Sequence, residues 1–283
     1  MCHAGYVAHM LLSAKIAPTF DYPVLHEFWS RADELGFHSV ANYDHFYGLT
    51  EMANPTYEGW TSLAAMACVV TRARVGCMVS GVTYRNPAVL AKMAVTVDHI
   101  SGGRLDFGLG AGWHEEEHRG YGLEFPSAAV RVDMLDEALT IIRRLWTEDV
   151  VSFEGRHYRL QDALANPKPL QKPHPPIVVG GEKPKMLRVI ARHADEWNVP
   201  SHGDVQAWAQ TSARLDEACA EVGRNPCEIR RSIQLFVLPA KDGHLEEQLA
   251  RLPELEALGC DHAVLSFYQP PSAQQMQRCA ELI

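Results

Sequence analysis

Residues 75–109 read VGCMVSGVTYRNPAVLAKMAVTVDHISGGRLDFGL, and this stretch decides the fold. An apolar run of strand length at 75–80 leads through a polar loop to a helical pattern at 87–100, and a second strand-like run follows at 105–109. Asn86 before Pro87 is typical of a helix start, because Asn caps free N–H groups and Pro fits the first helical turn. A strand, a helix and a strand in this order predict two parallel strands joined by a crossover helix.

The same alternation extends over the whole chain. Counting those two, eight strand-like runs lie at 13–17, 39–43, 75–80, 105–109, 177–179, 196–199, 233–238 and 263–267. Helical patterns occupy 23–35, 59–70, 87–100, 128–146, 185–193, 205–222, 245–258 and 273–282. Eight strand–helix pairs with no break in composition predict a (β/α)8 TIM barrel that forms a single domain over residues 1–283.

The main irregularity lies between the fourth and fifth strands. Residues 150–160 alternate apolar and polar around Glu154-Gly155 as in a hairpin, and the proline-rich residues 166–176 follow. Because proline cannot occupy a central strand, residues from about 147 to 176 are expected to be an insertion at the barrel rim.

Charge and composition argue against several classes of partner. The 26 Lys and Arg residues against 35 Asp and Glu give a net charge of −9 without a dense basic tract, so nucleic acid and membrane surfaces are not expected. No apolar run reaches the roughly 20 residues that cross a bilayer. Residues 1–12 lack the positive start of a signal peptide, which favours a cytoplasmic location. The seven cysteines form no CxxC pair, so no zinc knuckle is predicted.

Ligands bind such barrels where the strands end, so the residues after each strand are the candidates. Asp44 and His45 follow the second strand, and a histidine beside a carboxylate can exchange a proton near neutral pH. A histidine satisfied by the backbone is the alternative. Ser80 to Thr83 follow the third strand, where small and hydroxyl residues let a planar ring approach closely. A plain loop explains them equally.

The fourth strand is glycine-rich and ends in a histidine motif. Gly108, Gly110 and Gly112 imitate part of a dinucleotide fingerprint, but the final spacing and the acidic residue of that fingerprint are missing. Residues 114–118, HEEEH, match the HExxH zinc motif, with Glu137 as a conceivable third ligand. Because the segment follows a barrel strand directly, a polar loop or short helix is preferred, and a zinc hydrolase is a distant alternative.

A paired glycine, Gly180-Gly181, ends the fifth strand just before a helix. Free N–H groups at that helix start, with Lys183 and Lys185 nearby, would hold a phosphate. A glycine turn with two solvated lysines is the alternative.

Together these segments resemble the bacterial luciferase-like monooxygenase superfamily, and within it the coenzyme F420-dependent oxidoreductases. The most specific pieces are Asp44-His45-Phe46, residues 82–87 (VTYRNP), residues 98–104 (DHISGGR), residues 108–113 (GLGAGW) with Glu117-His118, Tyr121-Gly122, and Gly180-Gly181 with residues 194–198 (ADEWN). The resemblance covers nearly the whole chain.

The resemblance implies a barrel, usually a homodimer, that binds F420 and moves a hydride between this deazaflavin and a small organic substrate. An FMN-dependent monooxygenase is the alternative. By position, His45 is the expected proton-transfer residue and Asp44 positions cofactor or substrate. The resemblance also implies a non-prolyl cis peptide at Cys77–Met78, give or take one residue. The expected cofactor-binding residues are Asp44, Cys77, Met78, Ser80, Thr83, Ala111, Gly112, Trp113, Glu117, Gly180, Gly181 and Lys183.

One position departs from the F420-dependent sugar-phosphate dehydrogenases that this part of the chain resembles. Where they carry a catalytic glutamate soon after the glycine-rich strand, this sequence has Trp113. Oxidation of glucose 6-phosphate is therefore not expected, and an apolar or aromatic substrate is, with Tyr43, Phe46, Tyr47 and Trp113 as candidate walls. Barrel packing is the other explanation of these aromatics, and a barrel that binds a ligand without turnover is a further alternative.

Overall fold

Parallel strands close into a barrel in the computed structural model, which describes residues 10–49, 51–201, 204–238 and 243–283. The sheet order is β3-β2-β1-β11-β10-β9-β8-β5-β4, and an additional pairing of β3 with β5 closes the ring. Because β3 and β4 are two pieces of one interrupted strand, the barrel has eight strands and the predicted TIM barrel is confirmed. The strands are β1 (Leu11–Ile16), β2 (Ser39–Asn42), β3 (Arg74–Cys77), β4 (Ser80–Gly81), β5 (Leu105–Gly110), β8 (Ile177–Gly180), β9 (Glu196–Ser201), β10 (Arg230–Val237) and β11 (His262–Phe267).

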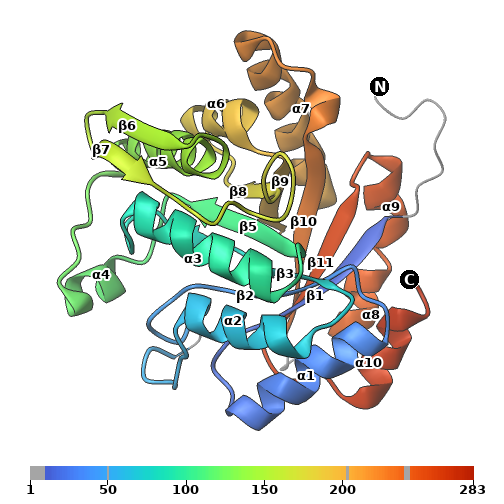
Figure 1. The fold of residues 1–283 in the computed structure, drawn as a ribbon. Coiled ribbons are helices and arrows are strands. Elements are labelled where there is room, and N and C mark those ends of the chain that lie inside the picture. The colour runs from blue at the N-terminus through green and yellow to red at the C-terminus, as the bar shows by residue number, and fades with distance from the viewer. Residues whose placement is uncertain (1–9, 50, 202–203, 239–242) are drawn as a thin grey trace.

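Helices surround the barrel as an outer layer (Figure 1). They are α1 (Tyr22–Glu34), α2 (Gly59–Val69), α3 (Pro87–Ile100), α4 (Glu115–Tyr121), α5 (Ala128–Thr147), α6 (Pro184–His193), α7 (Val205–Val222), the 3-10 helix η1 (Pro226–Glu228), α8 (His244–Leu249), α9 (Leu252–Ala257) and α10 (Ala273–Ala280). Among the described residues, no helix is both long and apolar enough to cross a membrane.

The predicted start of α3 is confirmed, whereas one predicted helix is not continuous. The Asn86 side chain accepts a hydrogen bond of 2.9 Å from the backbone N–H of Ala88, which caps α3 as expected. The single helix predicted over 245–258 is wrong, because the structure divides it into α8 and α9. Pro253 explains the break, since proline lacks an N–H and its ring clashes with the carbonyl four residues earlier, at Leu249, where α8 ends.

The third barrel strand is interrupted where one continuous strand, 75–80, was predicted. The Met78–Val79 peptide between β3 and β4 is cis, one residue beyond the expected position and within the stated margin. The glycines of β5 make room for this segment: a Cβ on Gly108 would lie 1.9 Å from the Cys77 carbonyl oxygen, and one on Gly110 2.8 Å from Val79 Cγ2. These glycines therefore serve the contact between two strands.

The predicted rim insertion is present as an antiparallel hairpin of β6 (Val150–Glu154) and β7 (Arg159–Leu164), which lies outside the barrel (Figure 1). Its turn is held by the Glu137 carboxylate of α5. This carboxylate accepts hydrogen bonds of 2.8, 2.9 and 3.1 Å from the backbone N–H groups of Arg156, His157 and Tyr158.

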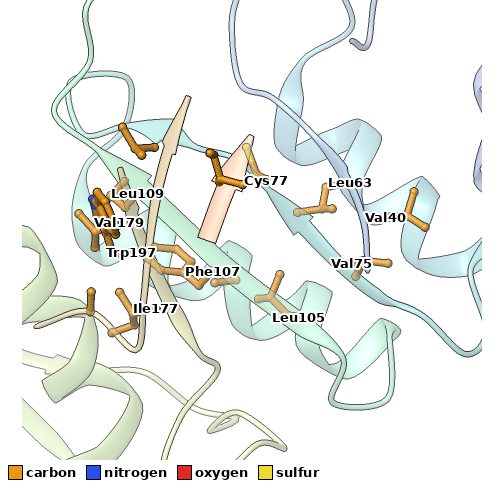
Figure 2. Close-up of a cluster of buried hydrophobic side chains, with 14 of the residues drawn as sticks. Val40, Leu63, Val75, Cys77, Leu105, Phe107, Leu109, Ile177, Val179 and Trp197 are labelled. Carbon is orange, nitrogen blue, oxygen red and sulfur yellow. The ribbon is translucent and has the colours of Figure 1, made fainter. Parts of the chain in front are cut away.

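The main apolar core lies between the strands and the helices. Phe107 of β5 contacts Trp60 and Trp146, with ring centroids 5.8 and 5.0 Å apart. Figure 2 shows Phe107 and Leu109 of β5 close to Val179 and Trp197 from the next strands of the barrel. All are buried, so this layer fixes the strands that carry the site.

A second, small apolar cluster lies inside the barrel and consists of Ala41, Met78, Val178 and Val264. Polar side chains occupy the barrel on both sides of it along the strands. Glu196 and His262 belong to the N-terminal ends of β9 and β11, whereas Lys15 and Gln234 lie further along β1 and β10.

Candidate active site

A histidine–glutamate pair lies where β2 ends. His45 follows this strand closely, and its Nδ1 is 2.7 Å from Oε1 of Glu117 on α4. The Glu117 side chain is fully buried; it also accepts the Phe46 backbone N–H at 2.8 Å and the Tyr84 hydroxyl. Within the described part of the chain, Nε2 of His45 has no hydrogen-bond partner. The pair therefore fixes the ring through Nδ1 and leaves Nε2 for a ligand.

The charge of Glu117 follows from these contacts. Burial by itself raises the pKa of this carboxyl, but the hydrogen bond and charge of His45, with the Tyr84 hydroxyl and the Phe46 N–H, outweigh it and lower the pKa to about 2. This ionised carboxylate occupies Nδ1 and fixes the orientation of the ring, so Nε2 is the nitrogen that faces a ligand. His45 can therefore accept a proton at Nε2 and give it back.

The structure places Asp44 against the protein rather than toward an opening. Its side chain is fully buried, and both oxygens accept hydrogen bonds from Arg85, at 2.5 and 3.0 Å. Arg85 also pairs with Glu58. A Cβ on Gly59 would lie 2.7 Å from Asp44 Oδ1, so glycine is needed for α2 to begin there. Asp44 thus anchors the chain next to His45.

Aromatic rings flank His45. The rings of Tyr43 and Trp113 lie 5.3 and 5.4 Å from it, and Trp113 is 62% exposed. Phe46 stacks on Tyr121 at 4.6 Å, and Tyr47 is 5.8 Å from Tyr121. Of the four expected wall residues, Tyr43 and Trp113 therefore adjoin His45, whereas Phe46 and Tyr47 pack on α4.

The residues after the third strand divide into a buried and an accessible set. Ser80 is fully buried, accepts the Trp60 indole N–H at 2.6 Å and donates to Cys77 Sγ at 3.6 Å. Cys77 is likewise buried. Met78 belongs to the small cluster inside the barrel. The structure thus closes off the side chains of Ser80 and Cys77.

The accessible set lies near the glycine-rich strand. Thr83 Oγ1 is 2.6 Å from His118 Nε2. Gly112 has φ +74°, and a Cβ there would lie 3.0 Å from Thr83 Oγ1. Arg131 donates to the carbonyls of Ala111 and Gly112 at 3.2 and 3.3 Å, which fixes the loop before Trp113.

A phosphate site was predicted at the start of α6, whose first residue, Pro184, has no N–H to donate. Helix geometry leaves the N–H groups of its first turn without intrahelical acceptors, and the helix dipole adds positive charge. Lys183, at the N-cap, is 84% exposed and its nitrogen lies 3.7 Å from Glu182. Gly181 accepts the Trp197 indole N–H at 2.8 Å, which positions the loop. Lys185 contributes less, because it bonds Asp133 at 2.7 Å. A phosphorylated ring cofactor fits these donors.

Two of the three residues of the alternative zinc site, His118 and Glu137, form other hydrogen bonds in the structure. His118 uses Nδ1 for the His114 carbonyl at 2.7 Å and Nε2 for Thr83. Glu137 holds the turn of the rim hairpin. Across the described ranges, no three His, Cys, Asp or Glu side chains form a metal-binding group.

Five residues of this region were missed by sequence reasoning: Lys15, Glu58, Tyr84, Arg85 and Tyr121 were assigned no role of their own. Tyr84 and Arg85 stand in the quoted stretch between the third strand and its helix, so their place at a strand end was a usable signal. Lys15 gave a weaker one, a lone charge within an apolar strand.

A closed barrel of eight parallel strands with an imidazole–carboxylate pair at the strand ends defines a (β/α)8-barrel enzyme. The chain belongs to the luciferase-like monooxygenase family, whose sequence model matches residues 7–276.

Its relatives use two kinds of cofactor. An FMNH2-dependent dimethylsulfone monooxygenase of Pseudomonas putida is 31% identical over 182 residues, 64% of this chain and 48% of that protein. An F420-dependent glucose-6-phosphate dehydrogenase of Intrasporangium calvum is 34% identical over 209 residues, 72% of this chain and 62% of that protein. The chain thus spans about half to two thirds of the length of these relatives.

A solved F420-dependent secondary alcohol dehydrogenase, in complex with an F420-acetone adduct, superposes with a TM-score of 0.84. It covers 97% of this chain, and 98% of its own length is matched, at 20% identity. This likeness concerns the fold.

Proposed function

We propose that the chain is an F420-dependent oxidoreductase that transfers a hydride between the deazaflavin and a small organic substrate. The observation that carries the proposal is the His45–Glu117 pair, with Nε2 of His45 left for a ligand at the strand ends. Hydride transfer to or from a carbonyl carbon requires a proton on the oxygen, and a histidine backed by a carboxylate exchanges it near neutral pH. When bound, the deazaflavin supplies the hydride chemistry.

The chain's own residues have distinct parts in this proposal. His45 holds the proton at Nε2, and Glu117, one of the predicted cofactor-binding residues, acts on the cofactor through the ring that it orients. Asp44 acts through Arg85 as a positioning residue. Thr83, Ala111, Gly112 and Trp113 line the cofactor near its ring, with Cys77, Met78 and Ser80 behind it. Gly180, Gly181 and Lys183 hold its phosphate.

The substrate follows from the walls near His45. Trp113 offers exposed aromatic surface there, and the buried Tyr43 ring adjoins the same histidine, which favours an apolar or aromatic body. Trp113 cannot exchange a proton in place of a glutamate, so sugar-phosphate oxidation is not proposed.

Equilibrium binding of purified protein to F420 and, separately, to FMN tests the cofactor. Quenching of the fluorescence of the six tryptophans reports binding. Micromolar or tighter F420 binding with weak FMN binding is expected. The opposite preference would assign the chain to the FMN-dependent monooxygenases, and binding of neither would overturn the proposal.

The homodimer and the cytoplasmic location implied earlier remain proposals. Sedimentation equilibrium of the purified chain tests the first, and fractionation of expressing cells the second.

A further inference from the structure

Lys15 is a buried amine that the proposed reaction does not use. It lies on β1, whose neighbours in the barrel are β2 and β11. Its Nζ nevertheless donates to Gln234 Oε1 on β10 at 2.5 Å and to the Met78 carbonyl after β3 at 3.4 Å. Since neither β10 nor β3 adjoins β1, the side chain reaches across the barrel interior.

The ammonium lies at the end of the barrel that carries His45. Met78 follows the last residue of β3, and Tyr43 follows the last residue of β2. Lys15 Nζ is 5.9 Å from the centroid of the Tyr43 ring, which in turn lies 5.3 Å from the His45 ring. One aromatic side chain thus contacts both groups.

A chain of amides orients the acceptor of Lys15. The Gln234 amide nitrogen donates to Asn198 Oδ1 at 2.6 Å, and the Asn198 amide nitrogen donates to Ser232 at 2.8 Å. Because the nitrogen of Gln234 is used in this way, its oxygen must face Lys15.

Within the ranges that the structure describes, no opposite charge balances this ammonium. Among the described residues, no carboxylate forms an ion pair with Lys15. The nearby Cys77 thiol and Tyr43 hydroxyl are neutral, because burial raises the pKa of each. Burial lowers the pKa of Lys15 to about 8, so the amine is still mostly protonated at pH 7. Two neutral acceptors occupy two of its three N–H bonds, and the third has no acceptor in the described part of the chain.

We propose that the Lys15 ammonium binds a negatively charged oxygen of the ligand, such as a carboxylate or enolate oxygen. A buried charge without a counter-ion costs folding energy, and an anionic ligand would offset that cost. This inference deepens the proposed function by naming the substrate class: an apolar or aromatic body that carries a carboxylate or an enolisable carbonyl. The same chemistry could come from an oxygen of the reduced cofactor ring.

Calorimetric titration with benzoate and with neutral benzamide tests the charge directly. Wild-type protein without cofactor should bind benzoate more tightly than benzamide. Lys15→Gln keeps hydrogen-bonding capacity and removes the charge, so it should weaken benzoate binding about tenfold to a hundredfold. Lys15→Arg, which keeps the charge, should retain most of the affinity. Lys172→Gln, in the proline-rich segment, is the matched control and should change nothing.

A second arm compares the affinity of each variant for oxidised and for reduced F420. If Lys15→Gln weakens binding of the reduced form alone and leaves benzoate unaffected, the negative oxygen belongs to the cofactor. Two results together overturn the proposal. The first is that wild type binds benzoate no more tightly than benzamide, or does not bind benzoate; the second is that Lys15→Gln leaves the affinity for reduced F420 unchanged. Because the benzoate arm needs no cofactor, failure to bind F420 and FMN would reject the proposed function separately.

Discussion

His45 shows at the scale of one residue how the barrel makes a reactive side chain. The sequence puts it three residues after a buried strand, and the fold adds Glu117 from a helix 72 positions later. The carboxylate takes Nδ1, so the proton that can move is the one on Nε2.

His45→Ala should reduce turnover at least a hundredfold and leave cofactor affinity within a few-fold of wild type, because general acid–base groups contribute roughly 10²–10⁴-fold. Steady-state kinetics and fluorescence titration check this. The exposed His26 on α1 provides the control, His26→Ala. Unchanged turnover in His45→Ala would remove His45 from the mechanism.

Glu117→Gln should lower kcat by about tenfold to a hundredfold with little change in KM, since the amide keeps the shape but loses the charge behind the ring. Steady-state kinetics separates the two parameters. An equal change in kcat and KM, or no change in kcat, would contradict the part given to Glu117.

At the scale of elements, the interrupted third strand depends on its neighbour. β5 can lie against Cys77 and Val79 only because Gly108 and Gly110 have no side chains. The rim hairpin likewise depends on α5, because the Glu137 carboxylate of this helix accepts the hydrogen bonds of the backbone N–H groups in the hairpin turn.

Gly108→Ala should destabilise the protein by about 3 kcal/mol or more, since the added methyl would overlap the Cys77 carbonyl. Denaturant unfolding measures the change. Gly180→Ala on adjacent β8 is the control: its Cβ would lie 3.4 Å from the Asn198 carbonyl oxygen, an ordinary contact. That variant should stay within about 0.5 kcal/mol. Similar losses in both would show that the close approach does not matter.

Glu137→Ala should cost about 2 kcal/mol, because three backbone N–H groups lose a charged acceptor. Limited proteolysis should then cleave near residues 155–158 faster than in wild type. Glu148→Ala is the control. Glu148 is the C-cap residue of α5, and this change removes only its i,i+4 ion pair with Arg144, which is worth about 0.5 kcal/mol. Unaltered cleavage in Glu137→Ala would contradict the role of this carboxylate.

At the scale of the whole molecule, the two ends of the barrel differ in purpose. At the end with His45, Nε2 of this ring has no hydrogen-bond partner among the described residues, whereas the opposite end is closed by a buried polar cluster. In that cluster His262 bridges Glu196 and Ser13, at 2.9 and 2.7 Å, and Arg230 pairs with Glu196 at 3.3 Å. The His38 ring lies 5.4 Å from that of His262. The proposed ligand site and this buried cluster thus lie at opposite ends of the barrel.

This cluster predicts acid sensitivity. Burial lowers the pKa of His38 to about 4, helped by the charges of His262, Arg230 and Arg74 against the opposing Glu196. The unfolded chain therefore binds a proton near pH 6.5, before the folded one does. The free energy of unfolding should fall between pH 6.5 and 4, with a slope approaching about 1.4 kcal/mol per pH unit for this proton.

Denaturant unfolding at several pH values measures that slope, which His38→Gln should reduce. His26→Gln, on an exposed position of α1, should keep it. A slope that persists in His38→Gln would assign the proton to another group. Glu196 makes a separate contribution. Burial raises the pKa of this carboxyl, but His262 and Arg230 outweigh it and lower the pKa to about 2. The free energy of unfolding should therefore fall further as the pH drops from about 4.3 toward 2.

Local chemistry made much of the fold predictable. The period of apolar residues and the Asn86-Pro87 helix start act over a few neighbouring residues, so the strands and most helices were found from sequence. The break at Pro253 had a local signal too, and the helix over 245–258 was predicted against it. The position of His45 after a strand was equally visible.

The partnerships in the site were decided by tertiary structure alone. Glu117 meets His45, Arg85 meets Asp44, and Lys15 meets Gln234 only because the barrel closes and brings distant strand ends together. Strands of a parallel barrel are buried on both faces, so their sequences do not say which side chains point inward. Residue types and spacing therefore determined the barrel and its reactive end, and closure determined which charges meet there.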